Sequence, residues 1–182
     1  MSIRPVVLYI TMSVDGFIAD TEGGVGWLAG APGEDYGYAQ FYEGVDAVLL
    51  GRKTYEQILG FDVGFPYADK PCYVFSSDES LPRAAESVEI VTTPAEEFVA
   101  RLKLSEGGPI WLGGGARLAT TLWDAGLVDE MHLFNQPIVL GGGIPLFSEP
   151  YQRRGLELLG SKSWPGGLVE VRYRVLKEWS GE

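Results

Sequence analysis

The sequence predicts one α/β domain over residues 1–182, built on a mixed sheet that is mostly parallel and gains antiparallel strands at one edge. Three observations predict it. Apolar runs alternate with amphipathic helical segments early in the chain, which is typical of a parallel sheet covered by helices. The end of the chain has strand-like segments and few helical signals. With 46% hydrophobic and 21% charged residues, the chain is also long enough to bury a substantial core.

The N-terminal residues predict a buried strand, a loop and a short helix. Residues 5–12 are apolar and rich in β-branched side chains, and turn formers follow them. Residues 17–27 are glycine-rich and predict a loop. Aromatic residues at helical spacing between positions 38 and 45 then indicate a short amphipathic helix.

Strand and helix units occupy the middle of the chain. Residues 45–60, VDAVLLGRKTYEQILG, predict a strand, a glycine, a basic pair and a helix, and residues 71–77, PCYVFSS, predict a strand that ends in polar residues. Residues 88–103 predict a strand followed by a helix. That helix is expected to begin with a capping box, in which Thr93 is the N-cap, Pro94 the first helical residue and Glu96 the partner.

Residues 109–126 predict a strand, three glycines and a helix. Leu118, Leu122 and Ala125 form one apolar face of this helix, and Gly126 is expected just past its end, at the position called C′. The later segments, residues 130–147, 156–167 and 168–179, are strand-like.

Composition excludes several classes of function. The net charge of −11, from 25 acidic and 14 basic residues, disfavours a nucleic acid or an anionic membrane as partner. Cys72 and His132 are the only residues of their types, so a disulfide framework and a zinc site of Cys and His are excluded, and no metal is expected. His132 lies in an alternating segment that predicts a strand, and we expect a structural role for it. The N-terminal apolar run is too short for a membrane span and lacks a cleavage pattern, so we expect a cytoplasmic protein.

Three glycines between a strand and a helix form the first candidate site. Gly113, Gly114 and Gly115 leave backbone N–H groups uncovered where the helix dipole is positive, which suits a pyrophosphate. A tight turn that allows close packing of helix on strand explains the same glycines equally well.

A second candidate site follows the strand that ends at Gly51. Arg52, Lys53 and Thr54 stand at the start of a helix, where two cations and a hydroxyl suit a phosphate monoester such as the 2′-phosphate of NADPH. A solvated surface pair is the alternative. Ser76 and Ser77, at the end of the next strand, could bind the same phosphate.

Four segments together resemble the dihydrofolate-reductase-like superfamily: TMSVDGFIA (Thr11 to Ala19), LLGRKTYE (Leu49 to Glu56), IWLGGGARLATTLWDAGLVDEMHLF (Ile110 to Phe134) and PIVLGGGIPLF (Pro137 to Phe147). More narrowly, nearly the whole chain resembles stand-alone proteins similar to the C-terminal reductase domain of the bacterial bifunctional riboflavin biosynthesis deaminase-reductase. The resemblance implies a dihydrofolate-reductase-like three-layer α/β/α fold with a mixed, mostly parallel central sheet and antiparallel C-terminal edge strands.

The resemblance also implies an oxidoreductase that transfers hydride from NADPH to a small heterocyclic substrate, of the 5-amino-6-(5-phosphoribosylamino)uracil reductase type. By motif, Gly51, Arg52, Lys53 and Thr54 would hold the adenosine phosphates, with Ser76 or Ser77 nearby. Gly113, Gly114, Gly115 and Ala116 would receive the pyrophosphate. Met12, Ser13, Ile18 and Ala19 would line the nicotinamide.

The proton donor has two candidates. Reduction of a C=N bond requires a proton as well as a hydride. Folate reductases use a carboxylate from the helix after the glycine-rich loop, and Asp35 stands at about that position; stabilisation of the helix N-terminus explains Asp35 equally well. Asp15 is the second candidate, because its loop faces the substrate in riboflavin-pathway reductases, and its alternative role is turn formation.

The motifs do not decide between several substrates. The zinc-binding deaminase partner is absent from the sequence, and Arg83, Arg101 and Arg117 have no assigned position to grip a ribose phosphate or a folate tail. Dihydrofolate reductase activity and a non-catalytic nucleotide-binding role therefore stay as alternatives. Related reductases are often dimers, and the apolar, aromatic segment at residues 168–179 is compatible with a homodimer interface. An internal edge strand explains this segment equally well.

Overall fold

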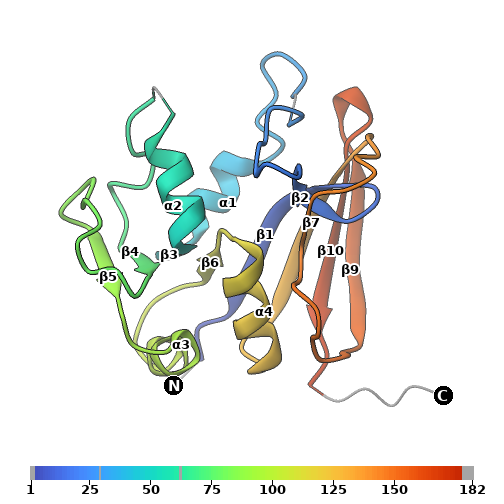
Figure 1. Cartoon of the computed structure of the whole chain (residues 1–182). Helices are drawn as coiled ribbons and strands as arrows, with labels where there is room; N and C mark the ends of the chain where they lie inside the picture. Colours follow the sequence, from blue (N-terminus) through green and yellow to red (C-terminus); the bar gives the residue numbers. More distant parts are fainter. Residues whose placement is uncertain (1–2, 29, 62, 178–182) are drawn as a thin grey trace.

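The computed structural model describes residues 3–28, 30–61 and 63–177. The strands are β1 (Val6–Ser13), β2 (Phe17–Ala19), β3 (Ala47–Gly51), β4 (Cys72–Phe75), β5 (Val88–Val91), β6 (Ile110–Leu112), β7 (Glu130–Gln136), β8 (Ile144–Pro145), β9 (Leu156–Ser163) and β10 (Val169–Val175). The helices are α1 (Tyr38–Gly44), α2 (Arg52–Leu59), α3 (Ala95–Lys103) and α4 (Ala116–Asp124), with a 3-10 turn at Pro165–Gly167. Figure 1 shows how the helices surround one large sheet.

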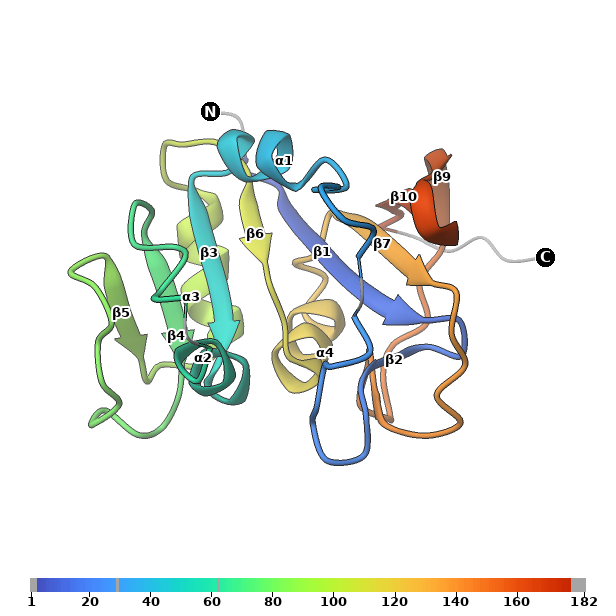
Figure 2. The same cartoon turned by 90° about the horizontal axis from the view of Figure 1, so that it is seen from above.

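Eight strands of the described chain form this sheet, in the order β5-β4-β3-β6-β1-β7-β10-β9. The six strands from β5 to β7 pair in parallel, and Figure 2 shows their arrows pointing the same way. The last two, β10 and β9, pair antiparallel. The predicted mixed sheet with an antiparallel C-terminal edge is therefore confirmed.

Side chains of β3 alternate between two hydrophobic clusters on opposite faces of the sheet. Ala47 and Leu49 belong to the cluster that also holds residues of α3 and α4. Val48 and Leu50 belong to the other, with buried residues of α2 and half-buried aromatics of α1. Because successive strand residues point to opposite faces, this buried strand places helices on both sides of the sheet.

The predicted end of α4 is confirmed, and the predicted start of α3 is wrong. Gly126 has a φ of 69° just past α4, and the amides of Gly126 and Leu127 donate to the carbonyls of Trp123 and Leu122, so the C′ prediction is confirmed. The capping box of α3 was wrong. The backbone at Pro94 is extended, with a ψ of 132°, so the helix begins one residue later at Ala95 and has no side-chain cap.

Two C-terminal predictions need correction or limits. Within residues 137–147, predicted to be strand-like, the structure has a loop and the two-residue strand β8, which pairs with β2 in a separate small sheet. The predicted strand over residues 168–179 is β10, which ends at Val175, and residues 178 and 179 lie outside the described residues. No helix over the described ranges is both long and apolar enough to cross a membrane.

Candidate functional site

The two predicted phosphate motifs meet at the carboxyl ends of neighbouring parallel strands. The amide of Gly51, at the end of β3, donates to the carbonyl of Gly114 over 2.8 Å. The amide of Gly113, just after β6, donates to the carbonyl of Leu49 over 3.0 Å. Segments more than sixty residues apart therefore form one surface at the edge of the sheet where ligands bind in open α/β folds.

The N-termini of α2 and α4 converge at this junction. Gly51 is the N-cap of α2 and Gly115 is the N-cap of α4, and neither helix receives a side-chain cap from that residue. A β-carbon added at Gly51 would lie 3.5 Å from the amide nitrogen of Gly115. Two sets of first-turn N–H groups and two positive dipole ends thus face the same region, which fits a diphosphate group.

Close packing also constrains these glycines. A β-carbon at Gly113 would lie 2.9 Å from Cδ2 of Leu50, and one at Gly115 would lie 3.1 Å from Oγ1 of Thr54. These contacts support the packing explanation for the glycine run, and phosphate binding there stays a prediction.

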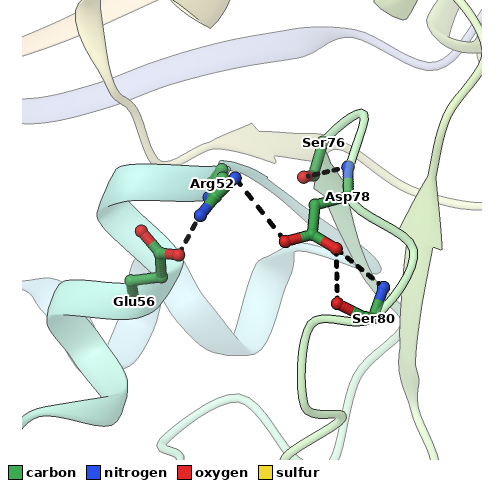
Figure 3. A network of polar contacts seen from close by, with 5 residues as sticks. All are labelled: Arg52, Glu56, Ser76, Asp78 and Ser80. Atoms are coloured by element: carbon green, nitrogen blue, oxygen red, sulfur yellow. Dashed lines mark hydrogen bonds and ion pairs between the residues drawn. The ribbon is translucent and has the colours of Figure 1, made fainter.

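Arg52 at the start of α2 is already paired with two carboxylates. Its Nε donates to Oε1 of Glu56 over 2.9 Å, and its Nη1 lies 3.7 Å from Oδ2 of Asp78 (Figure 3). These carboxylates hold the pKa of the guanidinium above its usual value, with the Glu56 hydrogen bond as the main cause. Arg52 is therefore a cation whose availability to a phosphate depends on its acidic neighbours.

The other predicted phosphate-binding residues lie around Arg52 in chain order. Lys53 follows it on α2 and is exposed, while Thr54 is half-buried. Ser76 follows β4, and its hydroxyl accepts a hydrogen bond from the amide of Asp78 over 2.9 Å (Figure 3). Ser77 is exposed beside it. The structure thus brings Arg52 and Ser76 to the same local network.

The predicted nicotinamide-lining residues lie at the carboxyl end of β1 and in β2. Ser13 is fully buried, and its hydroxyl accepts a hydrogen bond from the amide of Phe17 over 3.0 Å. Met12 and Ile18 pack against the cluster that contains α3 and α4, and Ala19 is 7% exposed. Ser13 therefore shapes the tight connection between the two strands, as a residue acting through backbone and shape would.

Asp15 connects the β1–β2 turn to the second glycine-rich loop. Its Oδ1 accepts a hydrogen bond from the amide of Leu140 over 3.1 Å, and its Oδ2 accepts one from Gly141 over 2.8 Å. A hydrogen bond with Ser13 is the main cause that lowers the pKa of this exposed carboxyl, and these two amides add to it. These bonds give Asp15 a structural role, and its role as proton donor stays a prediction.

Asp35 caps the start of α1 from outside the helix. Its Oδ1 accepts a hydrogen bond from the amide of Gly37 over 3.0 Å, and its Oδ2 accepts one from Ala39 over 3.1 Å. The Gly37 hydrogen bond is the main cause that lowers the pKa of this exposed carboxyl. The arrangement matches the alternative role weighed for Asp35, and its role as proton donor stays a prediction.

Sequence reasoning missed Asp78 and Glu56. The signal for Glu56 was its spacing four residues after Arg52 on a helix, which favours an ion pair. The signal for Asp78 was weaker, because only the fold brings the loop after β4 beside the start of α2. Asp78 follows Ser76 and Ser77 directly, so the predicted phosphate site contains an anion of its own.

His132 and Cys72 take no part in the hydrogen bonds described at the junction of Gly51 and Gly114. His132 is on β7, 6.1 Å from Tyr9 and 5.8 Å from Phe41 between ring centroids, and burial lowers its pKa. Cys72 is buried on β4, where desolvation raises the pKa of its thiol to about 12. The Cys72 thiol therefore stays protonated and is not set up as a nucleophile. In the part of the chain that the structure describes, no group of three or more His, Cys, Asp or Glu residues could hold a metal ion.

A separate hollow of about 280 Å³ lies at the C-terminal end of α4, beside Gly126, Arg154 and Val175. The guanidinium of Arg154 donates from Nε to the carbonyl of Trp123 and from Nη2 to that of Asp124, each over 3.0 Å. These bonds satisfy the last carbonyls of the helix. None of the predicted site residues lines this hollow.

Comparison with known proteins identifies relatives of this chain. Residues 4–169 match the family model described as RibD C-terminal domain. The uncharacterized protein YwjB of Bacillus subtilis strain 168 is 42% identical over 171 residues, which cover 93% of this chain and 97% of YwjB.

Two solved structures share the fold. A chain from Shewanella sp. PV-4 that is assigned to riboflavin biosynthesis superposes with a TM-score of 0.83 and 27% identity, covering 96% of this chain and 100% of that one. Dihydrofolate reductase from Enterococcus faecalis, complexed with NADP(H), superposes with a TM-score of 0.66 and 19% identity, covering 94% of this chain and 96% of the reductase. The domain thus has a dihydrofolate-reductase-like α/β fold.

Proposed function

The chain belongs to the RibD C-terminal domain family, and on that premise we propose that it is a reductase that transfers hydride from NADPH to a small heterocyclic substrate. The substrate we propose is an aminouracil that carries a ribose phosphate, as in 5-amino-6-(5-phosphoribosylamino)uracil. The oxidoreductase would act in riboflavin biosynthesis or in a reaction of the same chemical type.

One observation carries the cofactor proposal: two helix N-termini without side-chain caps converge where Gly51 contacts Gly114. First-turn N–H groups and positive dipole ends bind phosphate oxygens without any charged side chain. Arg52 and Lys53 add two cations at the same helix start. This combination favours a dinucleotide with an additional phosphate, which is NADPH.

The residues of the junction divide the cofactor between them in this proposal. Arg52, Lys53 and Thr54 hold the adenosine phosphates with Ser76 or Ser77, and the segment from Gly113 to Ala116 receives the pyrophosphate. Met12, Ser13, Ile18 and Ala19 line the nicotinamide. When bound, NADPH supplies the hydride, and the protein supplies its orientation and the exclusion of competing water.

The source of the proton separates this proposal from a second candidate function. Asp15 and Asp35 both accept two backbone hydrogen bonds and have lowered pKa values, so each strongly favours its ionised form near neutral pH. A carboxylate of this kind is a weak proton donor. This observation favours a nucleotide-binding protein without turnover as the second candidate function.

Binding of NADPH to the purified protein tests the cofactor proposal without any assumption about substrate. We expect Arg52→Ala combined with Lys53→Ala to weaken NADPH binding at least tenfold, because each charge-assisted phosphate hydrogen bond contributes roughly 1.5 to 3 kcal/mol. Arg101→Ala, which removes an exposed cation from α3, is the matched control and should leave the affinity unchanged. Equal affinity in the double variant and the wild type would show that the phosphate assignment is wrong.

Location and assembly complete the proposal. We infer a cytoplasmic homodimer that works on a small molecule, with neither a nucleic acid nor a membrane as partner. The strand expected at the interface, β10, lies inside the sheet between β7 and β9. The edge strand β9 supports a dimer in its place, because Leu156 is 40% exposed and Leu158 is 60% exposed on it. Sheet edges with exposed apolar side chains are surfaces that proteins ordinarily cover.

A further inference from the structure

A carboxylate occupies the surroundings of Arg52 where the proposed cofactor phosphate would bind. The Oδ2 atom of Asp78 lies 3.7 Å from Nη1 of Arg52, on the loop that follows β4 (Figure 3). Glu56 accepts a hydrogen bond from Nε of the same guanidinium over 2.9 Å. The cation is thus shared between two anions before any ligand arrives.

Asp78 is held in this position by its own loop. Its Oδ1 accepts hydrogen bonds from the amide of Ser80 over 3.0 Å and from the Ser80 hydroxyl over 2.5 Å. Its amide donates to the hydroxyl of Ser76 over 2.9 Å. The Ser80 hydroxyl is the main cause that lowers the pKa of Asp78, so the carboxylate is charged at neutral pH. Glu56 differs, because it is a longer side chain on an exposed helix surface, where its carboxylate pairs with Arg52.

The two nicotinamide cofactors present different groups to such a site. A phosphate monoester carries about −1.5 to −2 charges at neutral pH, so it is attracted by Arg52 and repelled by Asp78. The free 2′-hydroxyl of NADH has no charge and can donate a hydrogen bond to a carboxylate, as it does to the acidic residue of dinucleotide-binding folds. A fixed carboxylate beside the arginine therefore opposes the preference that the arginine creates.

We propose that Asp78 is a specificity-determining residue that competes with the 2′-phosphate for Arg52 and so narrows the preference for NADPH over NADH. This inference rests on the proposed function, because it assumes that the adenosine end of the cofactor lies at Arg52. It goes beyond that function by assigning opposite effects on cofactor choice to two neighbouring side chains. A protein with both charges accepts the two cofactors with more similar affinities than Arg52 and Lys53 alone would give.

Calorimetric titration of the full chain with four ligands tests the inference. The ligands are NADPH, NADH, adenosine 2′,5′-bisphosphate and AMP, so the effect of the 2′-phosphate is measured with and without the nicotinamide half. Asp78→Asn keeps the side-chain shape and the oxygen that accepts from Ser80. We expect it to raise affinity for NADPH and for the bisphosphate about three- to tenfold, which is the scale of a partly exposed charge pair with a multiply charged group. Affinity for NADH and AMP should stay the same or fall.

Glu79→Gln is the matched control, because it removes the same charge from the next residue, whereas the described ion pairs of Arg52 are with Glu56 and Asp78. It should change none of the four affinities by more than about twofold, since long-range effects at exposed sites are screened by salt. Melting curves for both variants check that the loop stays folded.

The outcomes separate the inference from the proposed function. If Asp78→Asn changes NADPH and NADH affinities equally, or changes neither, Asp78 does not set cofactor choice, and the proposed function stands. If Glu79→Gln reproduces the effect, the cause is net charge and the inference is overturned. If none of the four ligands binds the wild type or Asp78→Asn, the proposed function and this inference both fail.

Discussion

Replacement of Gly143 by alanine should destabilise the protein strongly, because this residue lies against the backbone of β2. Its φ is 153°, and a β-carbon placed on it would lie 2.2 Å from the carbonyl oxygen of Ala19. Ordinary contact at such an atom needs at least 3.4 Å, so the chain must move by more than 1 Å. Such a shift disrupts the pairing of Ala19 with Ile144 between β2 and β8.

The expected cost has two parts. An alanine in this sparsely populated backbone region costs roughly 1 to 3 kcal/mol, and relief of the overlap by backbone movement costs roughly 1 to 3 kcal/mol more. The free energy of unfolding should therefore fall by about 4 kcal/mol, which lowers the melting temperature by roughly 8 to 16 °C for a domain of this size. Differential scanning calorimetry measures both quantities.

Gly142→Ala is the control beside it. A β-carbon at Gly142 would meet Cγ2 of Thr21 at 3.8 Å, an ordinary contact, so its effect on stability should stay within about 0.5 kcal/mol. A melting temperature of Gly143→Ala within about 3 °C of the wild type, or an equal loss of stability in Gly142→Ala, would contradict this role of Gly143.

Two further predictions concern a buried hydroxyl and acid stability. The Tyr55 hydroxyl donates a hydrogen bond to the carbonyl of Pro82 over 2.8 Å and accepts one from the amide of Ala84 over 2.9 Å. Tyr55→Phe should therefore reduce the free energy of unfolding, measured in urea, by about 1 to 3 kcal/mol. An unchanged free energy would contradict a stabilising role for these two hydrogen bonds. The pKa values of Asp15 and Asp35 are lowered in the folded state, so their ionised forms stabilise the protein. This stabilisation is fully present above the unfolded pKa of about 3.9 and is lost as pH falls through the folded pKa. Asp15→Asn combined with Asp35→Asn should therefore be less stable than the wild type in urea at pH 7, with a gap that narrows below about pH 4; a gap independent of pH would show that these carboxylates contribute little through ionisation.

Local signals in the sequence predicted much of the fold because they act over a few residues. Gly126 ends α4 through hydrogen bonds between residues that are close in sequence. Successive side chains of β3 enter two different hydrophobic clusters because both faces of this strand are buried. The capping box of α3 failed for a local reason as well, since the extended backbone at Pro94 moves the helix start to Ala95. Threonine is a common N-cap residue, so the sequence pattern favoured Thr93. The pattern does not reveal the backbone angle at Pro94, which decides where the helix begins.

The candidate site was predictable only in part, because several of its contacts join distant segments. Residue types indicated Arg52 and the glycine run as candidate phosphate-binding segments, and NADPH binding there stays a prediction. The bonds from Asp15 to Leu140 and Gly141 cross about 125 residues of sequence, and the Asp78 to Arg52 pair depends on how the loop after β4 turns. The spacing of residues along the chain does not predict such contacts between distant segments.

Turnover is the most direct test of the central claim that this domain is a reductase. NADPH oxidation should be followed by absorbance with the phosphoribosyl aminouracil, with dihydrofolate and with no added substrate, in the wild type and in the Arg52→Ala, Lys53→Ala double variant. We expect steady oxidation that requires the aminouracil and is much slower in the double variant at limiting NADPH. Tight NADPH binding with no oxidation above the substrate-free rate would contradict it and identify a nucleotide-binding protein on a reductase fold.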